Sequence, residues 1–282
     1  MMNILLPTDF SENAFDAICH GIELFEDSTC VFYLMHAYTP AIYRVDYMLG
    51  SPGKVGLPDG HQQVAQTQLE EIRKNLVSKF KNPRHTFVTH AAFNNLVDEV
   101  QNTVKNENID IVIMGTQGAT GAKGIFLGSN TVHVLRIATV PVLIIPKKSK
   151  FRPLDHILFP TDFEIDYKLS GLDYLLNLAK QRKSKIHIMH VSSPYGLSKE
   201  QSSNKTILER IVATSNHYFY DEPDQEVIGA INNFQSQHDI QLLAMVHNKH
   251  TFLERLFVEP IIRNIGLRSL VPFLVLPYHP KS

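Results

Sequence analysis

The sequence predicts an α/β protein made of two tandem domains, each a doubly wound parallel sheet. Two observations support this prediction. Short apolar runs rich in Ile, Val and Leu alternate with amphipathic stretches, which is typical of buried parallel strands joined by helices. In addition, the opening segment ILLPTDF, residues 4–10, returns as ILFPTDF, residues 157–163. A repeat of this length indicates a duplicated domain, because solenoid repeats have shorter periods.

Two further pairs of segments extend the duplication over most of the chain. FYLMHAYTP at 32–40 matches IHIMHVSSP at 186–194, and VPVLIIP at 140–146 matches VPFLVLP at 271–277. The matching segments come in the same order in both copies. We therefore expect the two domains to have the same order of strands and helices.

A linker is expected between the copies. The segment PKKSKFRP, residues 146–153, has the proline and lysine content of an interdomain connection. A chain of 282 residues also has the length of two ordinary domains. The prediction is a first domain at residues 1–147 and a degenerate second domain at residues 152–282.

The elements follow in order along each copy. In the first copy, strands are expected at 3–6, 30–35, 85–89, 109–114 and 141–145, and helices at 12–25, 62–80, 95–106 and 128–137. In the second copy, strands are expected at 156–159, 185–190, 216–220, 241–246 and 272–276. Each domain thus has five strands.

Composition limits the class of protein. Apolar residues make up 44 % of the chain, enough for full cores, and the formal net charge is −1. No global field therefore attracts nucleic acid or an anionic membrane surface. The start lacks the features of a signal peptide, and no apolar run is long enough for a membrane span. With only Cys19 and Cys30 as thiols, we expect a reduced, cytoplasmic protein without nucleic-acid or membrane partners.

A glycine-rich loop follows the fourth strand of the first copy. It runs from Met114 to Arg136 and contains the pattern Gly115-x2-Gly118-x9-Gly128-Ser129. Glycines let a backbone approach a ligand closely, and a helix start offers free amides and a positive dipole end to an anion. The alternative is that these glycines only turn the chain. The preceding strand and following helix favour a phosphate site.

The loop after the first strand, PTDFSE at residues 7–12, carries the other candidates. Both loops follow strands, and open parallel sheets bind ligands beyond the carboxyl ends of their strands. Ser11 precedes a helical pattern, so its main role is expected to be that of N-cap. Asp9 precedes the cap and is the better functional candidate.

These segments resemble the universal stress protein family, over nearly the whole chain. The glycine pattern resembles the signature of the family's ATP-binding branch, PTDFSE its first loop and PVLIIP its last strand. The resemblance implies a strand order of 3-2-1-4-5 and pairing of the halves through their last strands as an intramolecular pseudo-dimer, and it leaves a homodimer open. It also implies ATP as ligand, with Mg or Mn as the candidate metal ion.

Site residues follow from the same resemblance. Pro7, Thr8 and Asp9 line the nucleoside side, and the backbone at Ala37, just past the second strand, meets the adenine. The phosphates are held around the glycine loop. The full implied cofactor-binding set is Pro7, Thr8, Asp9, Ala37, Met114, Gly115, Gln117, Gly118, Gly128, Ser129 and Asn130.

The second copy has lost this loop. Aligned without a gap, Gly115, Gly118, Gly128 and Ser129 correspond to Val246, Lys249, Glu259 and Pro260. Proline has no amide hydrogen, and a glutamate brings charge of the wrong sign. Asp162 is retained, so the segment ILFPTDF is repeated because the fold is repeated. The phosphate-binding pocket, in contrast, is expected to be absent from the second copy. One ATP per chain is predicted.

Two other segments are open to several interpretations. His247–Phe257 contains His247 and His250, but lacks the spacing of a metal site and is expected to form a contact surface or ordinary core. The stretch Ala41–Gln63 is a lid, a dimer contact or disordered. His36 and His190, at matching strand ends, are expected to be structural.

Three classes of function remain. The first is an ATP-binding regulatory protein of the stress response with at most slow hydrolysis, because no Walker A lysine motif and no catalytic residues are found. The second is an enzyme that transfers a nucleotidyl or phosphoryl group, which would need an acid, base or metal cluster. The third is an interaction module that binds no nucleotide.

Overall fold

The structure is a computed structural model that describes residues 1–38, 60–116, 127–147, 149–192, 194–222, 226–247 and 271–279. Gln117, Gly118, Lys249, Glu259 and Pro260 lie outside these residues, as do residues 41–59 and 248–257 of the two segments with open interpretations.

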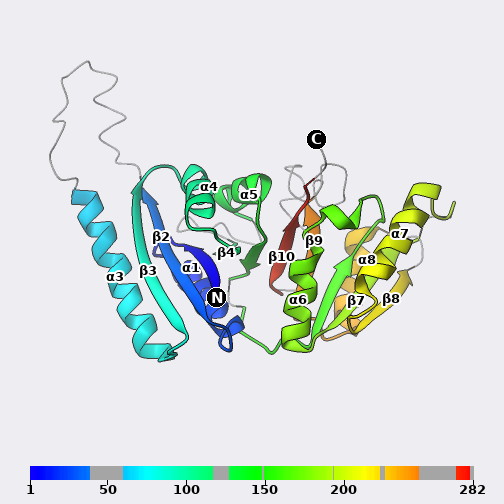
Figure 1. Cartoon of the computed structure of the whole chain (residues 1–282), viewed down its shortest axis with the longest axis horizontal. Coiled ribbons are helices and arrows are strands. Elements are labelled where there is room, and N and C mark those ends of the chain that lie inside the picture. Colours follow the sequence, from blue (N-terminus) through cyan, green and yellow to red (C-terminus); the bar gives the residue numbers. More distant parts are fainter. Residues whose placement is uncertain are drawn as a thin grey trace, which may run out of the picture.

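Strands and helices alternate through both halves of the chain (Figure 1). The first half contains β1 (Met2–Pro7), α1 (Glu12–Leu24), β2 (Cys30–Tyr38), α3 (Gly60–Phe80), β3 (His85–Phe93), α4 (Leu96–Asn106), β4 (Ile111–Gly115), α5 (Ser129–Ile137) and β5 (Val142–Ile145). The second contains β6 (His156–Pro160), the 3-10 turn η1 (Tyr167–Leu169), α6 (Leu172–Arg182), β7 (Lys185–Val191), α7 (Lys199–Val212), β8 (His217–Glu222), α8 (Val227–Gln237), β9 (Leu242–His247) and β10 (Phe273–Pro277).

The ten strands in the described part of the chain form one sheet, in the order β3-β2-β1-β4-β5-β10-β9-β6-β7-β8. Within each half the pairs are parallel, and the order 3-2-1-4-5 occurs twice, which confirms the predicted fold. The halves are not separate sheets, because β5 and β10 pair antiparallel, with Leu274 opposite Leu143. The segments VPVLIIP and VPFLVLP thus lie side by side at the centre of the molecule.

Two apolar clusters cover the two faces of the sheet. Along β1, Ile4 and Leu6 point into one cluster and Leu5 into the other, as the alternation of side chains along a strand requires. The first cluster takes buried residues from α1, α3, α6 and α7, and the second from α4, α5 and α8. Each cluster contains residues of both halves, so the core is continuous across the β5–β10 junction.

The strands β2 and β3 are longer than predicted. Their ladder runs from Cys30 opposite His85 to Tyr38 opposite Phe93, whereas the sequence suggested ends at residues 35 and 89. Ala37 therefore lies inside β2, opposite Ala92, and not just past the strand. The apolar pattern stops early because these strand ends are only partly buried, but backbone pairing does not need burial.

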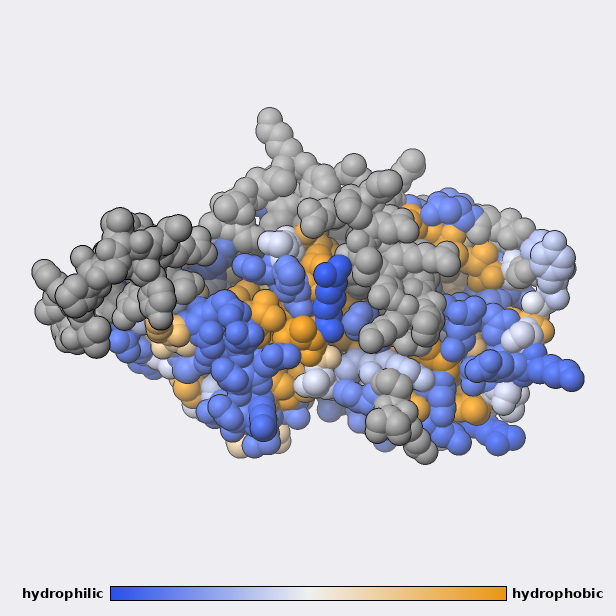
Figure 2. All heavy atoms as spheres, turned by 90° about the horizontal axis from the view of Figure 1, so that it is seen from above, coloured by the Kyte–Doolittle hydropathy of each residue, from blue (hydrophilic) through white to orange (hydrophobic). Residues whose placement is uncertain are grey.

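The described surface that is visible from above is mostly polar (Figure 2). Seen from above, hydrophilic side chains cover much of the visible part that the structure describes, with apolar patches between them (Figure 2). No helix within the described ranges combines the length and hydropathy needed to cross a bilayer.

Candidate functional site

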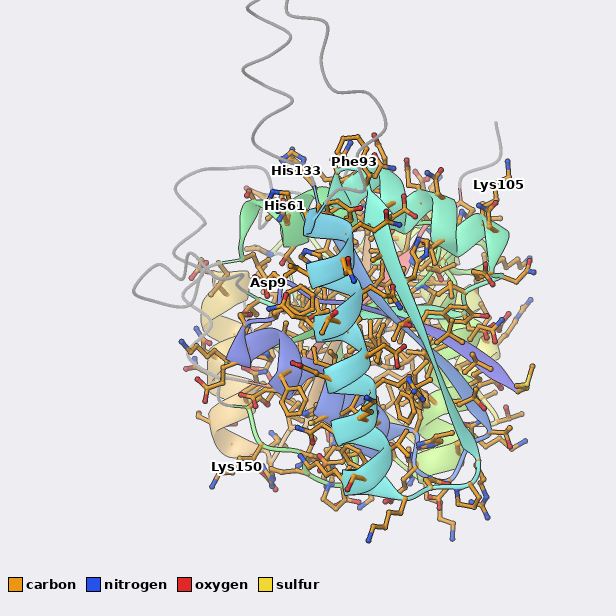
Figure 3. All side chains as sticks on the ribbon, turned by 90° about the vertical axis from the view of Figure 1, so that its left-hand side faces the viewer. Asp9, His61, Phe93, Lys105, His133 and Lys150 are labelled. Carbon is orange, nitrogen blue, oxygen red and sulfur yellow. The ribbon has the colours of Figure 1, made fainter. Side chains whose placement is uncertain are left out.

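The order of strands reverses between β1 and β4. The chain moves from β1 outward to β2 and β3, and then returns to place β4 on the other side of β1. Ligands of open α/β sheets bind beyond the carboxyl ends of the strands at such a point. Pro7 ends β1 and Gly115 ends β4, so two of the candidate residues lie here. In Figure 3, Asp9 lies toward the end of the first half where His61, Phe93 and His133 gather, and Lys150 lies at the other end.

The loop after β1 caps α1. Ser11 is the N-cap, and its Oγ accepts a hydrogen bond from the Ala14 backbone at 3.2 Å, which confirms its predicted role. The Asp9 carboxylate accepts hydrogen bonds from the Ser11 backbone at 3.1 Å and from the Ser11 hydroxyl at 2.6 Å. Asp9 therefore orients the capping serine in addition to any contact with a ligand.

A histidine at the end of β2 holds the same loop. The Nδ1 atom of His36 lies 2.7 Å from the carbonyl oxygen of Thr8, and the Thr8 amide donates to the Met35 carbonyl at 2.8 Å. The ring of Phe10 lies 4.3 Å from that of His36. Phe10 has a φ of 65°, which is uncommon for a bulky residue and needs such support. His36 is therefore structural, as predicted.

Contacts through Asn13 join this loop to the end of β4. A Cβ atom placed on Gly115 would come within 3.0 Å of Asn13 Cγ and 3.1 Å of the Asn13 backbone oxygen. The glycine is thus required by close packing between α1 and β4. This packing role was not foreseen, because the pattern of glycines alone suggested contact with a ligand.

The start of α5 is tied to the end of β4. The Gly128 amide donates to the Thr116 carbonyl at 2.7 Å, and the buried Thr131 hydroxyl donates to the Gly115 carbonyl at 3.1 Å. Gly128 is the N-cap and has no side chain to cap the helix. The next residues, Ser129 and Asn130, are exposed in the first turn, where helical amides have no partner within the helix.

The described candidate residues therefore form one constellation. Thr8 and Asp9 after β1, Met114 and Gly115 of β4, and the α5 start are linked through the α1 cap and the Thr131 bond. Ala37 lies two residues beyond Met35, the partner of Pro7. Among the described residues, no group of three histidine, cysteine or carboxylate side chains is arranged to hold a metal ion.

The second half repeats the first loop closely. His190 Nδ1 lies 3.0 Å from the Thr161 carbonyl oxygen, and the Glu164 amide donates to Asp162 Oδ1 at 3.1 Å. Phe163 has a φ of 59°, and its ring lies 4.7 Å from that of His190. His190 is thus structural, as predicted, and Asp162 keeps the backbone contact made by Asp9.

The helix after this loop is different. Instead of a helix that starts at once, the second half forms η1, a left-handed Gly171 with a φ of 60°, and only then α6 from Leu172. Tyr167 is buried, and its hydroxyl bonds the Thr161 hydroxyl. Because α6 starts later than α1 does, its first turn does not occupy the position beside the end of β9 that the start of α1 occupies beside β4. Val246 stands at this end of β9, in the position of Gly115. The Ser170-Gly171 pair was the signal in the sequence for this change.

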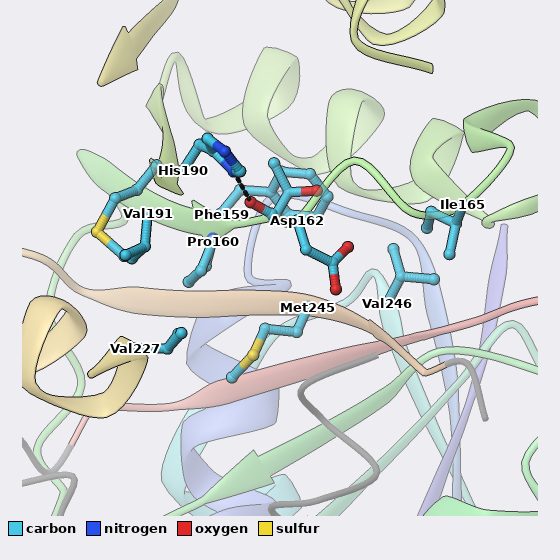
Figure 4. A pocket seen from close by; sticks show the side chains of 11 residues that line it. Phe159, Pro160, Asp162, Ile165, His190, Val191, Val227, Met245 and Val246 are labelled. Atoms are coloured by element: carbon cyan, nitrogen blue, oxygen red, sulfur yellow. Dashed lines mark hydrogen bonds between the residues drawn. The ribbon is translucent and has the colours of Figure 1, made fainter. Parts of the chain in front are cut away.

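A small cavity lies at this point of the second half, although the sequence of the second half does not repeat the glycine loop. Its volume is about 80 Å³. Figure 4 shows Met245, Val246, Val227 and Ile165 around it, with Asp162 and His190 on one side. The lining is mainly apolar, so the cavity is unlike a phosphate cradle.

Comparisons with known proteins agree with this architecture. The profile of the universal stress protein family matches residues 1–146. Two universal stress proteins of Methanocaldococcus jannaschii are similar to this chain, one 30 % identical over 152 residues and the other 29 % identical over 162. Each alignment covers 52 % of this chain, and 83 % and 95 % of the relatives, respectively.

A solved structure extends the likeness of fold to the second half. A universal stress protein from Archaeoglobus fulgidus is 20 % identical to this chain, with a TM-score of 0.68. The match covers 99 % of this chain and 97 % of that one. From the family profile over the first half and the relatives that match it, the chain belongs to the universal stress protein family.

Proposed function

We propose that this chain is an ATP-binding universal stress protein with a regulatory role in the cytoplasm. The observation that supports it best is the start of α5, where a helix without a side-chain cap opens beside the β1–β4 reversal. Free amides and the positive end of a helix dipole attract an anion, and phosphate groups bind to such helix starts.

Each part of the site has a role in this proposal. Thr8 and Asp9 line the nucleoside side, and Ala37 offers its backbone to the adenine. Ser129 and Asn130 contribute first-turn amides and polar side chains to the phosphates, together with Gln117 and Gly118. A Mg or Mn ion bound with the phosphates would neutralise their charge.

The proposed stoichiometry is one ATP per chain. The second half repeats the Asp162 loop, but Val246 takes the place of Gly115, and the helix after the Asp162 loop, α6, starts only at Leu172. In the sequence, Glu259 and Pro260 replace Gly128 and Ser129. A carboxylate repels phosphate and a proline offers no amide hydrogen, so neither substitution suits an anion site.

The antiparallel β5–β10 pairing supports a second part of the proposal, an intramolecular pseudo-dimer of residues 1–147 and 152–282. The two strands are buried and apolar. An edge of this kind tends to pair with another chain when it is left open. A homodimer would then have to use another surface.

The decisive experiment replaces Ser129 with proline, the residue found in the second half. Ser129 is the first residue of α5, and Gly128 before it has a ψ of 153°. Proline is accepted at this helix position, and an extended residue before it is what proline requires. Ser129→Pro should therefore fold normally, yet lack one amide at the anion site. Ser129→Ala, which keeps the amide, is the matched control.

Titration calorimetry with ATP and Mg²⁺ should give close to one site per chain. We expect Ser129→Pro, which loses both the amide hydrogen and the hydroxyl, to bind ATP at least about tenfold more weakly than the original chain, a difference of about 1.4 kcal/mol. Ser129→Ala, which loses only the hydroxyl, should bind ATP with an affinity between the two. Equal affinity of Ser129→Pro and the original chain would refute the site. Mass spectrometry of copurified ligands separates the other classes: AMP with turnover indicates a transfer enzyme, and an empty site together with no binding indicates an interaction module.

A further inference from the structure

A second hollow, remote from the proposed nucleotide site, lies between the two halves. Its volume is about 220 Å³. The first half contributes α1 and β5, the second contributes the starts of β9 and β10, and the linker closes one side. The lining residues that matter here are His20, Leu143, Lys150, Phe151, Arg152 and Leu242.

The charge of this lining has one sign. Lys150 and Arg152 are present, and no aspartate or glutamate is among the lining residues that the structure describes. Arg152 is engaged by Asp239, with a 2.9 Å hydrogen bond from Nη1 to Oδ1. Lys150 is exposed and has no ion pair among the described residues. A free cation at the edge of a mainly apolar hollow favours an anionic ligand.

His20 adds a buried polar group that the described residues leave without a hydrogen bond. The residue is only 7 % exposed, and its ring stands edge-on to Phe151 at 5.3 Å. Its buried Nδ1 has no hydrogen-bond partner. Burial lowers the pKa of His20 to about 4, so the ring is neutral near pH 7 and carries one N–H donor. Buried polar groups without a partner are rare and call for an explanation.

We propose that this hollow, called here the junction cavity, binds a small aromatic monocarboxylate. The apolar lining from Leu143, Phe151 and Leu242 receives the ring. The carboxylate forms an ion pair with Lys150 and accepts a hydrogen bond from the N–H of His20. A cavity of about 150 Å³ holds benzene, so about 220 Å³ has room for a benzene ring and a carboxyl group.

The ligand would bridge the halves, because α1 and β5 on one side and β9 and β10 on the other contribute to the lining. It binds the assembled fold and not the unfolded chain, and therefore raises the unfolding temperature with concentration. This effect does not depend on ATP, because the residues of the junction cavity belong to neither loop of the proposed nucleotide site.

The test uses the full chain without ATP and benzoate as the probe. Benzyl alcohol, which has nearly the same body without charge, and benzylamine, which has the opposite charge, are the comparison ligands. Thermal unfolding and titration calorimetry should show saturable binding of benzoate, at least tenfold tighter than that of benzyl alcohol, with benzylamine weakest.

Two variants locate the binding. Lys150→Gln changes an exposed side chain and should weaken benzoate at least fivefold, and His20→Phe, which keeps a ring beside Phe151, should do the same. Lys180→Gln, an exposed lysine on α6, is the matched control and should leave binding unchanged. Absence of saturable benzoate binding, equal binding of all three probes, or unchanged affinity in Lys150→Gln would each overturn the proposal.

Discussion

Gly115 and Val246 occupy matching places at the ends of β4 and β9, and their surroundings differ accordingly. Asn13 fills the space in front of Gly115 so closely that a Cβ atom would collide with it. In the second half the helix start is moved away by η1, and Val246 instead borders a cavity. The change from Gly115 to Val246 is thus accompanied by a different turn, η1, before the helix that follows the first loop.

We predict that Gly115→Ala destabilises the chain by about 1–3 kcal/mol, since overpacking forces neighbours to move. Gly60→Ala is the matched control, because nothing in the described part of the chain lies within 4 Å of a Cβ atom placed there. Its effect should be neutral or slightly stabilising, through a less flexible unfolded chain. Urea unfolding curves give both free energies. A loss that is no greater for Gly115→Ala than for Gly60→Ala would contradict the packing role.

Buried histidines make stability depend on pH. Burial lowers the pKa of His20 to about 4, and burial with nearby His156, His238 and Lys185 lowers that of His187 to about 4. Both values lie below 6.5, the ordinary value. The unfolded chain therefore binds more protons between pH 6.5 and 4, and stability is full above pH 6.5 and falls as pH is lowered.

We expect the free energy of unfolding to fall by on the order of 2 kcal/mol per buried histidine across this range. His187→Gln should flatten the dependence, at some cost at neutral pH, because His187 bonds the Tyr220 hydroxyl at 3.0 Å and His156 at 2.8 Å. Urea titrations at several pH values measure the slope. An equally steep slope in His187→Gln would mean that other groups carry the effect.

At the scale of elements, the apolar runs predicted the buried strands well, because a parallel sheet covered on both faces needs uninterrupted apolar residues. The ends of β2 and β3 were missed because they are only partly buried. The later start of α6 was not foreseen either, since the repeat indicated only the same order of strands and helices in both copies. Sequence similarity between the copies hid a local change in geometry.

The α1 cap provides a test at this scale. Ser11→Ala removes the bond to the Ala14 amide and the bond to Asp9, and should destabilise the chain by about 1 kcal/mol. Ser11→Thr retains the hydroxyl and is the matched control. Thermal unfolding measures both variants. If alanine and threonine behave alike, the hydroxyl does not hold the helix start.

At the scale of the whole molecule, the halves share a sheet, two clusters and several polar contacts. Arg182 of α6 donates to Asp27 at 3.1 Å and to the Leu24 carbonyl. Burial, with the carboxylate of Asp110 and Cys30 nearby, raises the pKa of Tyr174, a residue of α6 placed against the first half. The duplication was readable from sequence, but these contacts were not, because they join residues with no sequence pattern in common.

We predict that residues 1–147 alone associate or lose stability. Without β10, the edge of β5 and the buried side chains of Leu143 and Ile144 are uncovered. Sedimentation velocity and urea unfolding, compared with the full chain, measure the two effects. A fragment that stays monomeric with unchanged stability would show that the β5–β10 pairing contributes little.

The antiparallel pairing of β5 with β10 has a consequence for the choice of partner. Because both strands belong to one chain, the connection at residues 146–155 gives each half an effective local concentration of its counterpart in the millimolar range that short flexible linkers provide. Free copies of related domains at ordinary cellular levels cannot compete with that. Neither half then has to remain complementary to an identical copy of itself, and the two are free to specialise.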